Sequence, residues 1–169
     1  MVSEWLRAEH VSTWWRAPHD IGAVRAKYLP RILGEEPTEV FIASTAAGPV
    51  GLIQRYRFTD RGTWAATVAG TDLVLPAAAG IDYLIGVAAA TGRGLGTEMI
   101  STFTARLFDD HTDVQTIVVT PQRANRASCR VLEKSGYRLV WVGRLDSDDP
   151  SDAGDSSVYV THRPPPPVP

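Results

Sequence analysis

The sequence has little of what disulfide scaffolds, metal centres and membrane spans require. Cys129 is the only cysteine, so no intramolecular disulfide can form, and no second cysteine or neighbouring histidine activates its thiol. The histidines lie far apart and show no ligand spacing, so we expect no metal site. No apolar run approaches the roughly 20 residues that span a bilayer, and no signal-peptide pattern opens the sequence. We therefore expect a cytoplasmic protein.

Neither sign of charge is in excess. Seventeen basic side chains against nineteen acidic ones give a net charge of −2, so no overall field attracts nucleic acid or an anionic membrane. The 169 residues, 44% of them hydrophobic, suffice for one domain with a core. We predict one domain over residues 1–163, followed by a Pro-rich, mobile tail over 164–169. A small molecule is the expected partner, and a monomer or weak homodimer the expected state.

Hydrophobic periodicity predicts an α+β domain with a mixed sheet. A run over 59–79 has no sustained period, so we expect a long loop there, of the kind that often binds ligands. The strand before the Gly-rich segment and the strand after its helix are expected to be parallel, in a right-handed crossover. The expected helices are 3–15, 21–33 (broken or kinked at Pro30), 93–108 and 124–135, and the expected strands are 39–43, 50–56, 81–87, 114–120, 139–145 and 158–161.

A Gly-rich loop separates an apolar strand from a long amphipathic helix. It reads Thr91-Gly92-Arg93-Gly94-Leu95-Gly96-Thr97. Glycine at every second position lets the main chain approach an anion, and the amides of the next helix's first turn point toward it. The Arg93 side chain and the Thr97 hydroxyl are further candidates for phosphate contacts. The loop is typical of a pyrophosphate site.

Asp82 interrupts an otherwise apolar strand. It could pair with a local arginine or cap the loop, but an unpaired buried carboxylate is costly, and its placement favours function. Beside an amine, whose pKa lies near lysine's ~10.4, a carboxylate can take a proton, relay it through water, or bind the ammonium. We interpret Asp82 as a catalytic base or substrate anchor.

These segments resemble the GCN5-related N-acetyltransferase superfamily. Gly94-Leu95-Gly96 supplies the glycines of its Q/R-x-x-G-x-G/A signature, with Thr91 in place of Gln or Arg, and residues 125–127 with 132–137 look like its second cofactor segment. The resemblance implies an acetyl-CoA cofactor and a mixed central sheet in which the strand over 81–87 splays from its neighbour. A backbone amide there would then be free for the thioester carbonyl. The implied cofactor-binding residues are Ile85, Gly86, Val87, Thr91, Gly92, Arg93, Gly94, Leu95, Gly96, Thr97, Asn125 and Ala127.

A narrower resemblance is to the aminoglycoside 6'-N-acetyltransferases, which modify antibiotics and confer resistance. Glu4-Trp5-Leu6, Trp14-Trp15, Tyr28-Leu29-Pro30, Pro49-Val50-Gly51 and Gly80-Ile81-Asp82 carry it. In that family a strand usually precedes the Glu-Trp-Leu helix, and we do not expect it within this sequence. The resemblance implies that Asp82 is catalytic, and the implied substrate-binding residues are Trp15, Gln54, Tyr56, Asp72, Asp82 and Thr120.

Two positions depart from the family pattern. Thr120 stands where a carboxylate contacts the aminoglycoside, and Leu132 stands where a tyrosine is credited with protonating the departing thiolate. A thiol with a pKa near ~8.5 also leaves acceptably as a thiolate. Asp60, Asp72 and the aspartates over 146–155 could form an acidic rim for a polycation, although a solvated turn explains the later cluster.

The acceptor therefore stays open at the level of sequence. The first hypothesis is acetylation of a primary amine on a small cationic, aminoglycoside-like molecule. The alternatives are acylation of a siderophore precursor or of a peptide or protein amine, for which relatives use a histidine near the central strand, and none lies between His19 and His111. Loss of the tyrosine at position 132 would suit a third reading, a noncatalytic acyl-CoA-binding module.

Overall fold

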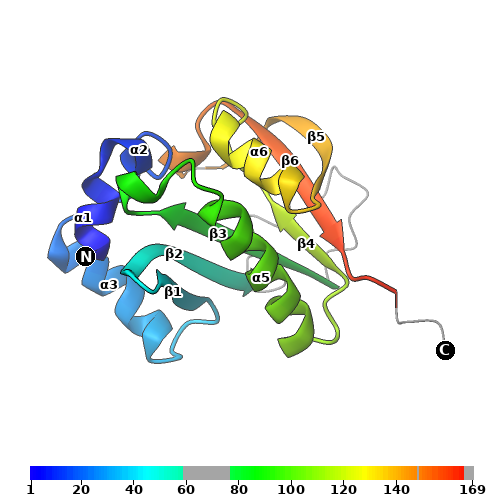
Figure 1. The fold of residues 1–169 in the computed structure, drawn as a ribbon, viewed down its shortest axis with the longest axis horizontal. Helices are drawn as coiled ribbons and strands as arrows, with labels where there is room; N and C mark the ends of the chain where they lie inside the picture. The colour runs from blue at the N-terminus through cyan, green and yellow to red at the C-terminus, as the bar shows by residue number, and fades with distance from the viewer. Residues whose placement is uncertain (59–76, 148, 166–169) are drawn as a thin grey trace.

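A mixed six-stranded sheet organises the chain in the computed structural model, which describes residues 1–58, 77–147 and 149–165 (Figure 1). The strand order is β1-β2-β3-β4-β6-β5. The strands are β1 (Glu39–Thr45), β2 (Gly48–Arg57), β3 (Ala78–Ile85), β4 (Thr116–Val119), β5 (Arg138–Arg144) and β6 (Asp155–His162). The helices are α1 (Val2–Arg7), α2 (Glu9–Ser12), α3 (Ile21–Ile32), α5 (Leu95–Asp110) and α6 (Arg126–Lys134), with short 3-10 turns η3 (Ala88–Ala90) and η4 (Pro150–Asp152).

Among the strand pairings of the described residues, β3–β4 alone is parallel, as the crossover through α5 requires. The expected mixed sheet and the parallel crossover are confirmed. Successive side chains on a strand point to opposite faces, so β2 presents Leu52, Gln54 and Tyr56 to one face and Ile53 and Arg55 to the other.

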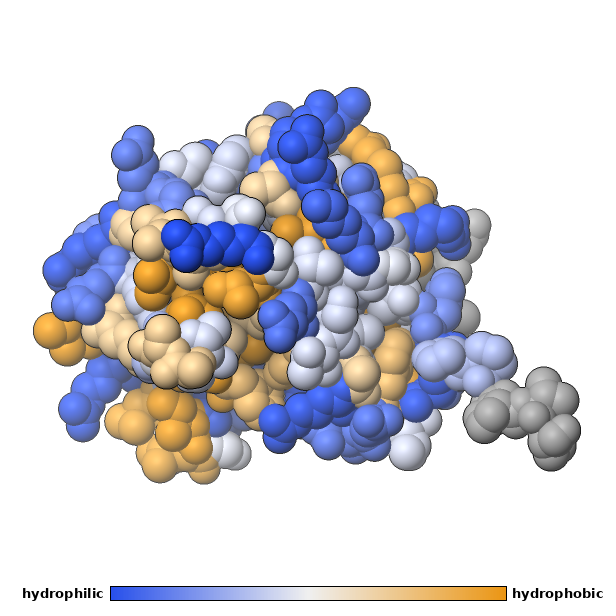
Figure 2. Space-filling view, in the orientation of Figure 1, coloured by the Kyte–Doolittle hydropathy of each residue, from blue (hydrophilic) through white to orange (hydrophobic). Residues whose placement is uncertain are grey.

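Two apolar clusters lie on opposite faces of this sheet. α5 and α6 cover one face, where Ile100, Phe103 and Leu107 recur at helical spacing and pack with Ile117 and Leu132. On the other face the N-terminal helices cover β2 and β3 through Trp5, Leu6, Val11 and Tyr28, which pack with Leu52 and Leu84. Ile32 and Leu33 at the C-terminal end of α3 are exposed. Figure 2 shows an apolar patch at the lower left, where α3 lies in Figure 1.

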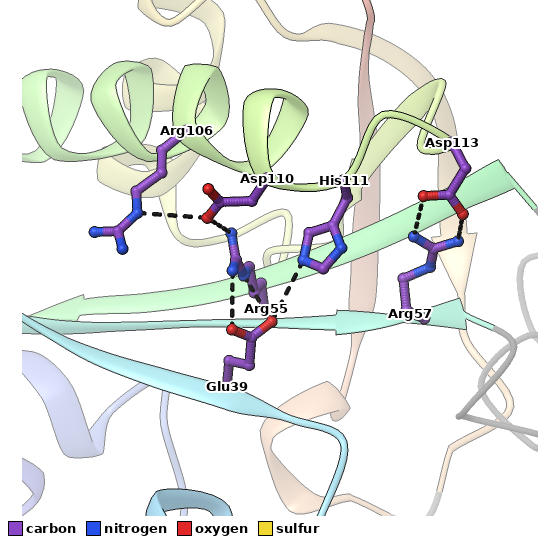
Figure 3. A network of polar contacts seen from close by, with 7 residues as sticks. All are labelled: Glu39, Arg55, Arg57, Arg106, Asp110, His111 and Asp113. Atoms are coloured by element: carbon purple, nitrogen blue, oxygen red, sulfur yellow. Dashed lines mark hydrogen bonds and ion pairs between the residues drawn. The ribbon is translucent and has the colours of Figure 1, made fainter. Parts of the chain in front are cut away.

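A buried arginine joins the sheet to the end of α5. The Arg55 guanidinium donates to both oxygens of Glu39 at 2.9 Å and to Asp110 at 2.7 Å, and it lies near the rings of Phe41 and Phe103. Figure 3 shows the ion pairs of Arg55 beside the neighbouring pair of Arg57 and Asp113. These contacts tie β2 to β1 and to the end of α5, on the face of the sheet opposite to Gln54 and Tyr56.

The sequence-based expectations need four corrections. The single helix expected over 3–15 is two helices, because Ala8 adopts an extended conformation (φ −60°, ψ 131°). Trp5 and Val11 would lie about 120° apart around a continuous helix, and the break lets both enter one cluster. Pro30 lies within α3 without ending it.

The other corrections concern the strand and helix that flank the Gly-rich loop. β3 begins at Ala78, inside the run expected to be a loop, and ends at Ile85, while α5 begins at Leu95. The rest of that expected loop, 59–76, lies outside the described residues, with Asp60 and Asp72, and so does the end of the tail, 166–169. In the described parts of the chain, no helix has the length and apolarity needed to cross a membrane.

Candidate active site

β3 and β4 separate in the middle of the sheet. Their pairing covers Ala78–Gly80 of β3 against Thr116–Val118 of β4, whereas β3 runs on to Ile85. Because backbone amides point alternately to the two sides of a strand, the amides of Tyr83 and Ile85 face away from β2 and toward this gap. The splay expected from the family is confirmed.

The strand before the Gly-rich loop was expected to have a free backbone amide near Ile85 to Val87, and the structure favours Ile85. Gly86 and Val87 both donate to the Val50 carbonyl oxygen, at 2.8 and 3.3 Å, so their amides serve the sheet. The Ile85 amide faces the gap, and the Ile85 carbonyl accepts from His10 Nε2 at 3.0 Å. Gly86 has a packing role instead, because a Cβ there would lie 2.0 Å from the Trp5 ring.

A cavity of about 200 Å³ opens on one side of the gap, and we call it the Asp82 cavity. It combines aromatic walls with several carboxylates and two basic side chains. Its lining is Trp14, Trp15, Lys27, Arg31, Gln54, Tyr56, Ile81, Asp82, Tyr83, Val119, Thr120, Pro121, Gln122, Asn125, Ser128, Asp149, Ser151 and Asp152.

A directed chain of hydrogen bonds holds the Asp82 carboxylate. Arg31 Nη1 donates to Gln54 Oε1 at 2.9 Å, and Gln54 Nε2 donates to Asp82 Oδ2 at 2.7 Å. The Tyr56 hydroxyl lies 3.3 Å from Asp82 Oδ1. Because arginine only donates, it fixes which end of the Gln54 amide faces Asp82. The carboxylate thus receives donors from two β2 side chains.

A second cavity, of about 450 Å³, begins at the Gly-rich loop, and we call it the glycine-loop cavity. Gly92 and Gly94 adopt positive φ angles of 71° and 85°, which other residues rarely adopt. No side chain in the described residues caps α5 at Gly94, and the first helical bond runs from the Glu98 amide. The preceding amides of the first turn are therefore available to an anion. The lining is His10, Val11, Trp14, Trp15, Tyr83, Leu84, Ile85, Ala90, Thr91, Gly92, Gly94, Gly96, Thr97, Asn125, Ala127, Ser128, Arg130, Val131 and Lys134.

The two cavities share a wall of five side chains: Trp14, Trp15, Tyr83, Asn125 and Ser128. The Asn125 side chain caps α6 by accepting from the Ser128 amide at 3.1 Å, which places the start of this helix at the wall. The Tyr83 hydroxyl lies 2.5 Å from Ser128 Oγ. A group held in one cavity therefore meets a group held in the other between β3 and α6.

Most of the residues chosen from the sequence lie around these two cavities. Gln54, Tyr56, Asp82 and Thr120 line the Asp82 cavity, and Trp15 lines both. Of the proposed cofactor residues, the glycine-loop cavity gathers Ile85, Thr91, Gly92, Gly94, Gly96, Thr97, Asn125 and Ala127, but not Gly86, Val87, Arg93 or Leu95. The Arg93 side chain is exposed.

Other lining residues were not among the site residues named from the sequence, although the aspartates over 146–155 were considered as a possible acidic rim. Asp149 and Asp152 reach the Asp82 cavity from η4, so part of the acidic cluster lines the site rather than only a solvated turn. Arg130 and Lys134 bring positive charge from α6 to the glycine-loop cavity. Their spacing of four on one helix was the available signal. Position 132 lies elsewhere, since Leu132 is fully buried against the sheet and lines neither cavity.

Known proteins resemble this chain in sequence and in fold. The aminoglycoside N(6')-acetyltransferase type 1 of Klebsiella pneumoniae is 32% identical over 142 residues, which are 81% of this chain and 67% of that protein. The crystal structure of aminoglycoside acetyltransferase AAC(6')-Ib in complex with coenzyme A superposes with a TM-score of 0.80 at 29% identity, covering 96% of this chain and 88% of that one. A structure of AAC(6')-Ib with coenzyme A and kanamycin gives 0.79 at 28% identity, with coverage of 96% and 88%. The model of the acetyltransferase (GNAT) domain matches residues 1–144, and the chain belongs to this acetyltransferase family.

Proposed function

We propose that the chain is an acetyl-CoA-dependent aminoglycoside 6'-N-acetyltransferase. The observation that carries the proposal is the position of Asp82, whose carboxylate is held by donors from β2 in a cavity that shares a wall with the glycine-loop cavity. An amine held by Asp82 and an acyl donor held by the Gly-rich loop would meet at that wall.

The glycine-loop cavity has the chemistry that coenzyme A requires. Amides at the start of α5 and the glycines of positive φ suit the pyrophosphate, and Arg130 and Lys134 suit a further phosphate. Apolar side chains such as Val11, Leu84 and Val131 suit the uncharged arm of the molecule. Bound acetyl-CoA supplies the acetyl thioester.

Asp82 binds the acceptor as an ammonium and takes up one of its protons, directly or through water, so that the nitrogen lone pair can attack. The Ile85 amide, which points into the gap, donates to the oxyanion that develops on the acetyl carbonyl. Trp14 and Trp15 keep bulk water from the wall.

The acidic lining supports a cationic acceptor. Asp82, Asp149 and Asp152 line one cavity, so the site has further carboxylates although Thr120 replaces the one expected from the family. Solved relatives of this chain hold kanamycin or ribostamycin together with coenzyme A. An aminoglycoside, with several ammonium groups, matches these charges.

The test is thiol release from acetyl-CoA in the presence of kanamycin or tobramycin, followed with a thiol-reactive dye. We expect turnover by the wild-type protein and, in Asp82→Asn, a rate lower by at least about a hundredfold, the scale of general base catalysis. Asparagine keeps the shape of the side chain, so thermal melting should be little changed. Coenzyme A binding without thiol release across aminoglycosides, lysine derivatives and peptides would contradict the proposal, and equal rates in the variant would remove Asp82 from its role.

A further inference from the structure

We propose that Tyr83 is the proton donor to the departing sulfur, with Ser128 as the residue that positions its hydroxyl. This inference rests on the proposed function, because it assigns a group to the second half of the same acetyl transfer. It fills a role left open by the sequence, since Leu132 stands where a tyrosine would donate and lies buried outside both cavities.

The wall between the cavities is where the bond to sulfur must break. Of the five side chains that line both cavities, only Tyr83 and Ser128 carry a hydroxyl. Tryptophan and asparagine donate hydrogen bonds but do not give up a proton near neutral pH. The hydroxyl pair is therefore the proton source that the described lining places between donor and acceptor.

The order of the two hydroxyls follows from their acidity. A phenol, with an ordinary pKa near ~10, is a stronger acid than an aliphatic alcohol, so the tyrosine is the better terminal donor. Ser128 Oγ, 2.5 Å from the Tyr83 hydroxyl, then donates to the phenolic oxygen and stabilises it as the proton leaves. Burial raises the pKa of Tyr83 above its ordinary value, and the Ser128 hydrogen bond opposes this, so the phenol is protonated near neutral pH.

Two elements hold the pair in place. Tyr83 is fixed by β3 and packs against the core under α5 and α6, and Ser128 lies in the first turn of α6, whose start is fixed by the Asn125 cap. Both groups are thus set by regular structure rather than by a loop, which favours precise orientation.

The step balances in atoms and charge. The amine nitrogen forms the new C–N bond, the C–S bond breaks with its electron pair going to sulfur, and sulfur takes the phenolic proton of Tyr83 to become the free thiol. The acceptor nitrogen loses two protons in all, through Asp82 and water. Tyr83 recovers one from the solvent, and the net product is one proton with the acetamide and the thiol.

The chain offers a matched control for the test. Tyr137 also pairs with a hydroxyl, that of Thr104 at 2.7 Å, but it is buried in the core and lines neither cavity. Tyr83→Phe and Tyr137→Phe each remove one hydrogen-bonded phenol oxygen. We expect Tyr83→Phe to lower kcat about tenfold to a hundredfold, at the lower end for general acid catalysis because a thiolate can also leave unprotonated, with little change in KM for acetyl-CoA. Tyr137→Phe should stay within about twofold, and Ser128→Ala should lie between the two variants.

A binding measurement separates this inference from the proposed function. Calorimetric titration with coenzyme A and with desulfo-coenzyme A, which lacks the sulfur, needs no acceptor. We expect Tyr83→Phe to weaken coenzyme A several-fold and to leave desulfo-coenzyme A unchanged. Equal losses for both ligands, or equal kcat in Tyr83→Phe and Tyr137→Phe, would overturn the assignment. The wild-type protein could acetylate no aminoglycoside while Tyr83→Phe still weakens the binding of coenzyme A but not of desulfo-coenzyme A. In that case the proposed acceptor is wrong and the role of Tyr83 stands.

Discussion

Arg55 and Arg57 provide a sharp comparison of a buried and an exposed ion pair on the same strand. Both lie on the same face of β2, yet the Arg55 side chain is 7% exposed and bridges Glu39 and Asp110, whereas Arg57 is 24% exposed and pairs with an Asp113 that is 65% exposed (Figure 3). The perturbation is Arg55→Ala, with Arg57→Ala as its matched control. Only the first should cost substantial stability.

The magnitude follows from what Arg55→Ala removes. The change deletes three charge-assisted hydrogen bonds and the ring contacts of the guanidinium, and it leaves two carboxylates facing each other. Removing one partner of a buried pair typically costs about 3–5 kcal/mol, and we expect about 2–3 kcal/mol here because the carboxylates stay 47% and 38% exposed and regain water. For a chain of this size that is a fall in Tm of about 5–10 °C. Arg57→Ala should change Tm far less, as exposed pairs do.

The assay is thermal melting and urea unfolding at pH 7 and again near pH 3. The Arg55 hydrogen bonds hold the pKa of Glu39 below its ordinary 4.5 and that of Asp110 below 3.8. Since the folded-state pKa values are lowered, the stabilisation is complete above the ordinary values and is lost as the pH falls through the folded ones. The gap between wild type and Arg55→Ala should therefore narrow near pH 3.

Two results would refute this reasoning. One is an Arg55→Ala variant no less stable than Arg57→Ala at pH 7, and the other is a gap that is unchanged near pH 3. Activity provides an internal check. Arg55 points to the opposite face from Gln54 and Tyr56, so kcat at a temperature where the variant is folded should stay within about twofold of wild type.

Two further predictions concern the site itself. In Gly80→Ala the new Cβ would lie 2.5 Å from the Tyr56 ring, so the ring must move and its hydroxyl must leave Asp82. We expect kcat/KM to fall about tenfold, the scale of one hydrogen bond to a charged group. Tyr56→Phe should lower kcat/KM by the same factor in steady-state kinetics. If Gly80→Ala is as active as wild type, the Tyr56 contact is irrelevant. Asp152→Asn should raise the KM for kanamycin several-fold with kcat nearly unchanged, because Asp152 lines the Asp82 cavity. Asp146 lies outside that lining, so Asp146→Asn should leave the KM unchanged. Equal KM values in the two variants would exclude Asp152 as an anchor for the acceptor.

The candidate site residues that the structure places at cavities include those that interrupt the local sequence pattern. The Gly-rich loop and Asp82 stand out because each breaks the pattern around it, and both line cavities. The extended conformation of Ala8 has no signal in the local sequence, because it depends on the packing of Trp5 and Val11 in one cluster on the sheet.

Residues that meet only through the fold are hard to assign from sequence. The aspartates over 146–155 allowed either an acidic rim or a solvated turn, and only the path of the chain into β6 brings Asp149 and Asp152 to the lining of the Asp82 cavity. The pair of Tyr83 and Ser128 joins positions 45 apart in sequence, and neither is unusual where it stands. The Val50 carbonyl, which accepts from the amides of Gly86 and Val87, likewise belongs to a strand distant in sequence.

The short pairing between β3 and β4 gives the sheet inner edges as well as outer ones. Beyond Gly80, the backbone groups of β3 that point away from β2 are not paired with β4, while β2 lies behind them and apolar clusters lie on both faces. An outer edge can pair with any extended chain, which is why such edges are often protected. An inner edge can be reached only by a group that fits between two strands of one sheet. We therefore expect the width of this gap to limit which ligands can reach β3, before any side chain contributes specificity.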